Sequence, residues 1–61
     1  MEHIYILNFD DEEINIIANN DQEAIKQVEE FIEHEQINLP CVLTDRLTKP
    51  GEPIIREIQR W

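Results

Sequence analysis

Residues 3–9, with the sequence HIYILNF, decide the fold of this chain. Side chains in an extended segment alternate between two faces, and here both alternating sets are apolar. One set is Ile4 and Ile6, and the other is Tyr5, Leu7 and Phe9. A strand that is apolar on both faces is typical of the interior of a sheet, where it is covered from both sides. The segment therefore predicts a central strand.

A short polar break, Asp10 to Glu12, separates this strand from a second apolar segment. Residues Glu13–Ala18 (EINIIA) alternate again, with Ile14, Ile16 and Ala18 on one side and Asn15 and Ile17 on the other. Two extended segments joined by so short a break predict an antiparallel hairpin, although its turn contains no glycine.

The next segment has the features of a helix. Asn20 followed three residues later by Glu23 predicts an N-cap, with the Glu23 carboxylate reaching back toward Asn20. Apolar residues then recur at helical spacing over about 120° of the helix circumference. They are Ala24, Ile25, Val28, Phe31 and Ile32. We expect a helix from Asp21 to about Glu35, ended by Leu39 and Pro40, because proline disfavours helical geometry in the residue before it.

Two further apolar segments, Cys41–Leu47 and Ile54–Gln59, flank Pro50-Gly51, which suits the central positions of a type II turn. A hairpin with this turn places Leu47 opposite Ile54, Asp45 opposite Arg56, and Leu43 opposite Ile58, and each pair is complementary. A helix is the alternative, because Pro53 suits a first turn and the apolar residues also fit helical spacing. Those residues are Ile54, Ile55, Ile58 and Trp61. We expect the hairpin.

Together these segments predict one α+β domain over residues 1–61, with the element order ββαββ. A right-handed crossover through the helix places the first strand between the second and the third. The expected sheet is mainly antiparallel, has four strands in the order 2-1-3-4, and carries the helix on one face. The other face would stay open, which predicts a homodimer through that face or a partner that covers it.

Size and composition restrict the class of function. Sixty-one residues suffice for one small domain, and 41% hydrophobic residues predict a packed core. Cys41 is the single cysteine and cannot form an internal disulfide. The residues after Met1 lack a basic flank followed by a long apolar run, so we do not expect a secretion signal. We therefore expect a soluble protein of the reducing cytoplasm. A net charge of −9 disfavours direct binding to nucleic acid or to an anionic membrane, and no segment approaches the length of a membrane span.

Acidic residues are concentrated in the first part of the chain. Eleven of the fourteen lie between Glu2 and Glu35 against Lys26 alone, which gives a net charge of −10, whereas residues 36–61 carry +1. In the expected topology the helix runs back toward the turn of the first hairpin. Acids at that turn and in the second half of the helix should therefore converge in an acidic pole. It comprises Asp10, Asp11, Glu12, Glu13, Glu29, Glu30 and Glu33, with Glu35 beside it.

Three explanations of the acidic pole remain open. The first explanation is that the acids only keep the protein soluble. Alternatively, six acids along about 22 Å of helix give one charge per about 4 Å, close to the phosphate spacing along one strand of a duplex. Such a surface would act as a DNA mimic, by analogy with small inhibitors of restriction or CRISPR enzymes. A divalent cation is the third explanation, but the run from Asp10 to Glu13 lacks the spacing and the glycine of an EF-hand loop.

We expect a non-enzymatic interaction module, without cofactor or metal, whose partner is a protein with a basic surface, such as a nucleic-acid-binding protein. The alternative is a small structural homodimer with a solubilising acidic surface. The expected partner-binding residues are the acidic pole and Trp61. Trp61 is expected to cover the edge of the core or to anchor the interface, since tryptophan is enriched at binding hot spots.

Residues that often carry chemistry do not form a recognisable site in this sequence. The spacing of His3, His34 and Cys41 fits none of the paired zinc patterns. Cys41 alternates with Leu43, as a core residue does, and the exit of the helix separates it from His34, so a nucleophile and base pair is not expected. The single glycine, Gly51, excludes a glycine-rich phosphate loop.

Overall fold

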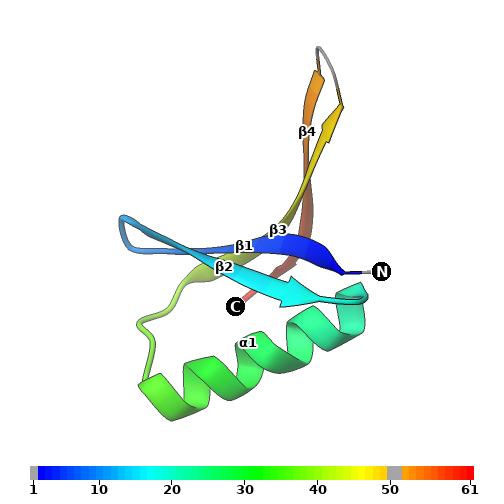
Figure 1. Cartoon of the computed structure of the whole chain (residues 1–61). Helices are drawn as coiled ribbons and strands as arrows, with labels where there is room; N and C mark the ends of the chain where they lie inside the picture. The colour runs from blue at the N-terminus through cyan, green and yellow to red at the C-terminus, as the bar shows by residue number, and fades with distance from the viewer. Residues whose placement is uncertain (1, 50–51) are drawn as a thin grey trace.

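The computed structural model describes the backbone of residues 2–49 and 52–61 and the side chains of residues 2–45 and 56–61. A four-stranded sheet carries helix α1 on one face (Figure 1). The elements are β1 (His3–Phe9), β2 (Glu12–Ala18), α1 (Asp21–Glu35), β3 (Cys41–Lys49) and β4 (Glu52–Arg60). The expected α+β class and element order are confirmed.

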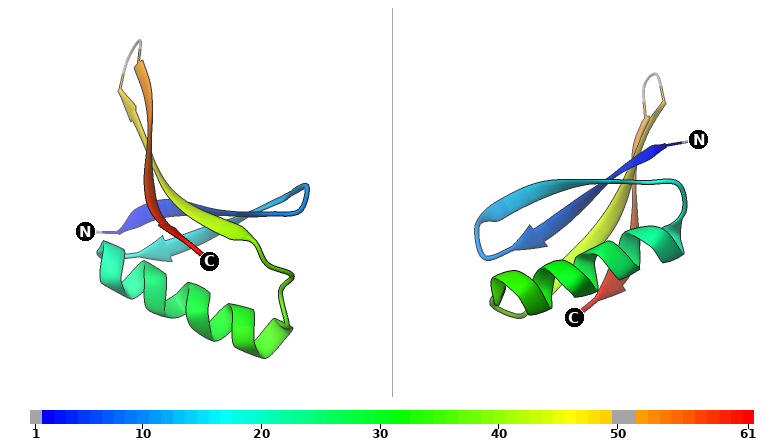
Figure 2. Two further views of the ribbon diagram at one scale, coloured as in Figure 1. Left: turned by 180° about the vertical axis from the view of Figure 1, so that it is seen from behind. Right: turned by 60° about the horizontal axis from the view of Figure 1, so that its bottom comes forward.

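β1 is a central strand, as its two apolar faces predict. It pairs antiparallel with β2 on one side and with β3 on the other, and β3 pairs antiparallel with β4, so that the strand order is β2-β1-β3-β4. The outer part of the β3–β4 hairpin projects away from α1 in every view (Figures 1 and 2).

The first hairpin turns without glycine because an aspartate adopts the left-handed conformation. Phe9 pairs with Glu12, which leaves Asp10 and Asp11 as the two turn residues. Asp10 has a φ of 50°. Aspartate tolerates this region because its short side chain can form local hydrogen bonds. β2 therefore begins at Glu12, one residue before the expected start.

α1 has the expected bounds and N-cap, but a different C-terminal signal. The Asn20 side chain accepts a hydrogen bond of 2.8 Å from the backbone N–H of Glu23. The Glu23 carboxylate accepts from the side chain of Asn19 and does not reach back to Asn20. The helix ends where Gln36 takes a φ of 53° and the N–H of Ile37 donates to the carbonyl of Ile32. This left-handed cap stops the helix four residues before Pro40.

The core lies between α1 and the face of the sheet that it covers. It is formed by side chains from β1, β2, β3 and α1, namely Tyr5, Leu7, Phe9, Ile16, Ala18, Ala24, Val28, Cys41 and Leu43. Every second residue of β1 from Tyr5 to Phe9 contributes to it. No helix in residues 2–49 or 52–61 combines the length and hydrophobicity needed to cross a membrane.

The second hairpin is longer than expected and contains one irregularity. Residues 52–60 form a strand, so the alternative helix is excluded. Leu47 pairs with Ile54 and Asp45 with Arg56, as expected. Leu43, however, pairs with Gln59 and not with Ile58, because the register shifts between Leu43 and Thr44. A β-bulge inserts an extra residue without a required sequence signature. The expected turn at Pro50-Gly51 lies outside the described residues.

Candidate interaction site

The seven carboxylates of the acidic pole are all exposed. Those of the β1–β2 turn and those in the second half of α1 lie toward the same end of the molecule, one group in the sheet layer and the other in the helix layer (Figures 1 and 2). Among the described residues, none of the seven forms an ion pair. Glu13 pairs with Asn8 on the face of the sheet opposite α1, so the pole carries exposed, unpaired negative charge but does not form one continuous surface.

The described residues provide no arrangement that suits a metal ion. Within residues 2–49 and 52–61, no three His, Cys, Asp or Glu side chains come close enough to share one. Burial raises the pKa of the Cys41 thiol, which keeps it in the neutral, unreactive form. The Cys41 side chain is part of the core, as its alternation with Leu43 predicts.

Trp61 packs against the core and also lies beside two acids of the acidic pole. Its backbone N–H donates to the carbonyl of Cys41 at 2.9 Å and its own carbonyl accepts in return, so that the residue continues the edge pairing of β4. The half-buried indole packs against the core cluster. It also lines a surface depression of about 200 Å³ together with Glu29, Ile32 and Glu33. Two acids of the pole and an aromatic ring therefore share one concave surface.

A second depression lies next to the first along α1. It measures about 760 Å³ and is lined by Gln27, Glu30, Phe31, Glu33 and His34. Glu33 borders both depressions. The acids in the second half of the helix thus surround concave, partly apolar surface.

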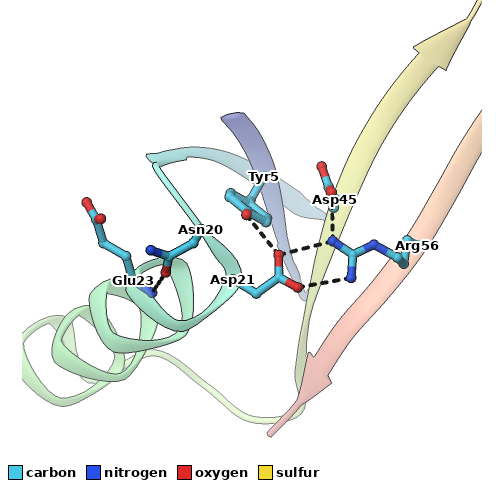
Figure 3. A network of polar contacts seen from close by, with 6 residues as sticks. All are labelled: Tyr5, Asn20, Asp21, Glu23, Asp45 and Arg56. Carbon is cyan, nitrogen blue, oxygen red and sulfur yellow. Dashed lines mark hydrogen bonds and ion pairs between the residues drawn. The ribbon is translucent and has the colours of Figure 1, made fainter. Parts of the chain in front are cut away.

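A network of four polar side chains lies at the opposite end of the helix (Figure 3). Arg56 on β4 donates two hydrogen bonds of 3.0 Å to the two carboxylate oxygens of Asp21. It donates a third, of 2.9 Å, to Asp45, which is only 4% exposed. The hydroxyl of Tyr5 donates to Asp21 at 2.9 Å. The network connects the N-terminal end of α1 with β1, β3 and β4.

The charges of this network shift the protonation equilibria of its members. Hydrogen bonds from Arg56, and then from Tyr5, lower the pKa of Asp21 below its ordinary value. Burial is the main cause that raises the pKa of Tyr5 to about 12, and the bond to Asp21 adds to it. Asp21 and Asp45 raise the pKa of Arg56 further above its usual range. Each shift favours the protonation state that the observed hydrogen bonds require.

The sequence predicted one pair of this network and missed the rest. The expected register of the second hairpin places Asp45 opposite Arg56, and the structure confirms this pair. Asp21 was expected only as a first-turn residue, and Tyr5 only as a core residue. The register of β1 with β3, which places Tyr5 opposite Asp45, is the signal that could have revealed Tyr5.

The sheet face opposite α1, here called the open face, is a third candidate surface. Ile4 and Ile17 on this face are 57% and 56% exposed, and Ile6 and Val42 are half-buried. On this side of the sheet the outer part of the β3–β4 hairpin projects away from α1 (Figure 1).

Comparisons with known proteins give no relative from which a role could be transferred. No family model, curated protein or solved structure shows significant similarity to this chain.

Proposed function

We propose that the protein is a non-enzymatic interaction module of the cytoplasm that binds a basic surface of another protein through its acidic pole, in the manner of a DNA mimic. The observation that supports this proposal is the exposure of all seven carboxylates without an ion pair among the described residues. Uncompensated charges of one sign attract an oppositely charged partner over a distance and raise the association rate.

The pole has an energetic cost that a basic partner would remove. Glu29 and Glu33 are four residues apart on α1, where like charges repel by about 0.2–0.5 kcal/mol. Acids in the last turn also oppose the helix dipole. Basic side chains placed against these carboxylates would offset both effects.

The spacing of the free acids favours a partner that normally binds nucleic acid. Asp21 is engaged by Arg56, which leaves the unpaired charges of α1 concentrated toward its C-terminal end. Four carboxylates between Glu29 and Glu35 span about 9 Å of helix axis. The phosphates along one strand of a duplex lie at similarly short separations. A groove whose basic side chains bind those phosphates would therefore also fit these carboxylates.

Trp61 gives the pole an apolar contact beside its charges. A partner arginine in the depression between Trp61, Glu29 and Glu33 would contact both carboxylates and the aromatic ring. Such a contact supplies the short-range packing that long-range attraction alone does not provide.

Affinity capture with matched charge reversals tests the proposal. The wild-type protein, Glu33→Lys and Glu2→Lys are immobilised and exposed at low salt to an extract of the source cells. Both substituted residues are exposed, and both changes alter the net charge equally, but only Glu33 belongs to the pole. We expect a basic protein to be retained by wild type and Glu2→Lys, lost with Glu33→Lys, and displaced by added duplex DNA. Equal retention by all three proteins would contradict the proposal.

A further inference from the structure

β2 forms one edge of the sheet, and that edge is regular. The strand pairs with β1 on one side only, and the β3–β4 hairpin lies at the opposite side of the sheet (Figure 1). β2 contains no proline, and its register with β1 runs without a shift from Glu12 to Ala18. An edge of this kind presents unpaired backbone N–H and C=O groups, with which another extended chain can pair.

The register with β1 identifies which backbone groups point outward. Phe9 and Glu12 flank the two-residue turn and form a hydrogen-bonded pair. Along an antiparallel ladder such pairs alternate with pairs that are not hydrogen-bonded. Glu13, Asn15 and Ile17 belong to the second kind, so their backbone N–H and C=O groups point away from β1.

A hydrogen bond from α1 is consistent with this assignment. The side-chain amide of Gln27 donates to the outward carbonyl of Ile17 at 3.0 Å. The helix therefore caps the edge near the end of β2. Among the described residues, no protein group forms a hydrogen bond with the outward backbone groups of Glu13 or Asn15. The part of the edge nearer the β1–β2 turn is thus open.

The other edge of the sheet is poorly suited to the addition of a strand. The register of β4 with β3 shifts between Leu43 and Thr44, and β4 contains Pro53, which has no backbone N–H. Bulges and prolines both hinder pairing at a strand edge. β2 is therefore the edge at which a further strand can bind.

Unpaired acids lie on both sides of the open part of this edge. Glu12 and Glu13 are exposed at the start of β2. Of the strands, β2 has the closest backbone contacts with α1. Gln27, which bonds to the edge, also borders the depression of about 760 Å³ that Glu30 and Glu33 line. Among the described residues none of these acids forms an ion pair, so charge complementarity requires a basic occupant.

We propose that the edge of β2 binds an extended basic segment of a partner protein, which pairs antiparallel with β2 as a fifth strand. The inference rests on the proposed function and gives the basic partner a binding mode. The backbone of the segment would pair with the outward groups of Glu13 and Asn15, as in other complexes formed by strand addition.

The two faces of the sheet select different side chains of the bound segment. Side chains of an added strand alternate between the faces. Those on the side of α1 would lie beside the depression of Glu30 and Glu33, where lysine or arginine fits. Those on the open face would lie beside Ile17, which is 56% exposed, where an apolar residue fits. The preferred segment therefore alternates basic and apolar residues.

A second copy of this chain is a poorer occupant of the edge. Its own β2 would bring another Glu12 and Glu13 to the interface, and each copy carries a net charge of −9. Like charges at close range oppose association. The charge of the edge therefore favours a basic segment over self-pairing.

Asn15→Pro and Asn15→Ala form a matched pair of variants that tests the proposal. Both remove the same exposed side chain and preserve the net charge, but only proline removes the outward N–H and places its ring at the edge. The probe is a fluorescent peptide of about eight residues that alternates lysine and valine. Its binding is measured by fluorescence anisotropy at about 50 mM salt.

We expect wild type and Asn15→Ala to bind the peptide within twofold of each other, and Asn15→Pro to bind it at least tenfold more weakly. A peptide with glutamate in place of lysine should not bind. Equal binding of the lysine peptide by the two variants, or no binding of it by wild type, would overturn the proposal.

Hydrogen exchange of wild type tests the same contact without a substitution. The amide hydrogens of Glu13 and Asn15 should exchange rapidly in the protein alone and at least tenfold more slowly with the peptide bound. The amides of Ile14 and Ile16 bond to β1 and should be protected in both states. Unchanged exchange at Glu13 and Asn15 would overturn strand addition.

Failure of this inference is distinguishable from failure of the proposed function. If Glu33→Lys and added salt weaken peptide binding while Asn15→Pro and Asn15→Ala bind equally, a basic partner still fits the acidic pole and strand addition is wrong. Sedimentation of the protein alone should show no association through β2. A dimer that is lost in Asn15→Pro and kept in Asn15→Ala would place a second copy at the edge and overturn the proposal.

Discussion

Arg56 on the last strand binds both carboxylate oxygens of Asp21 in the first turn of α1, with two hydrogen bonds of 3.0 Å. The same guanidinium reaches the buried carboxylate of Asp45. One side chain therefore holds the N-terminal end of the helix against two strands of the sheet.

We predict that Arg56→Gln lowers the thermal unfolding midpoint more than Arg60→Gln does. Removal of Arg56 leaves the carboxylate of Asp45, which is 4% exposed, without its cation. Arg60 pairs with Glu57 at the surface, where such pairs contribute about 0–1 kcal/mol. Thermal denaturation of the dilute proteins gives the comparison, and equal midpoints would show that the network contributes no more than a surface pair.

The lowered pKa of Asp21 predicts a pH-dependent stability difference between wild type and Asp21→Asn. Because the pKa is lower in the folded state, the ionised form contributes stability above the unfolded value, near pH 4. This contribution is lost as the pH falls through the folded value. Urea unfolding of both proteins from pH 7 to pH 2 should show wild type more stable at pH 7, with the difference shrinking below about pH 4. A constant difference would contradict the assignment.

Tyr5 allows a test at alkaline pH, where stability should be lost as the pH rises. Its titration can be followed directly because it is the only tyrosine in the chain. Its pKa is raised to about 12 in the folded protein, so its contribution to stability is complete below about pH 10 and is lost as the pH rises through 12. Absorbance titration near 295 nm should give a midpoint near 12 for the native protein and near 10 in denaturant. A native midpoint near 10 would contradict burial of the hydroxyl beside Asp21.

Replacement of the N-cap, Asn20→Ala, should destabilise the protein by about 0.5–2 kcal/mol, because the N–H of Glu23 loses its acceptor. Asn20→Asp should be nearly neutral, since aspartate caps as well as asparagine does. Asn19→Ala is the neighbouring control, and it removes only a longer exposed bond of 3.3 Å. The ranking is checked by chemical denaturation, and a larger loss for Asn19→Ala than for Asn20→Ala would contradict the assigned cap.

Much of the fold follows from local patterns in the sequence. The apolar faces of β1 identify a central strand, and the pair Asn20 and Glu23 marks the start of α1. The bulge beside Leu43 could not be predicted, because no glycine or proline marks it and the one-residue shift leaves the alternation on each side intact.

The sites depend on contacts between distant residues, and these are harder to infer. The exposure of the acidic pole follows from its composition alone. The contact between Asp21 and Arg56 spans 35 residues, and it requires the angle at which α1 crosses the sheet. The meeting of Trp61 with Glu29 and Glu33 depends on the same angle, which no local pattern encodes.

The salt dependence of binding to the captured basic protein is the most direct test of the proposed function. Affinities of wild type and Glu33→Lys are measured between about 50 and 200 mM salt, the range in which contacts to a phosphate-binding surface weaken steeply. We expect the dissociation constant of wild type to rise at least tenfold, with a shallower dependence for Glu33→Lys. An affinity that does not change with salt would contradict the role of the acidic pole.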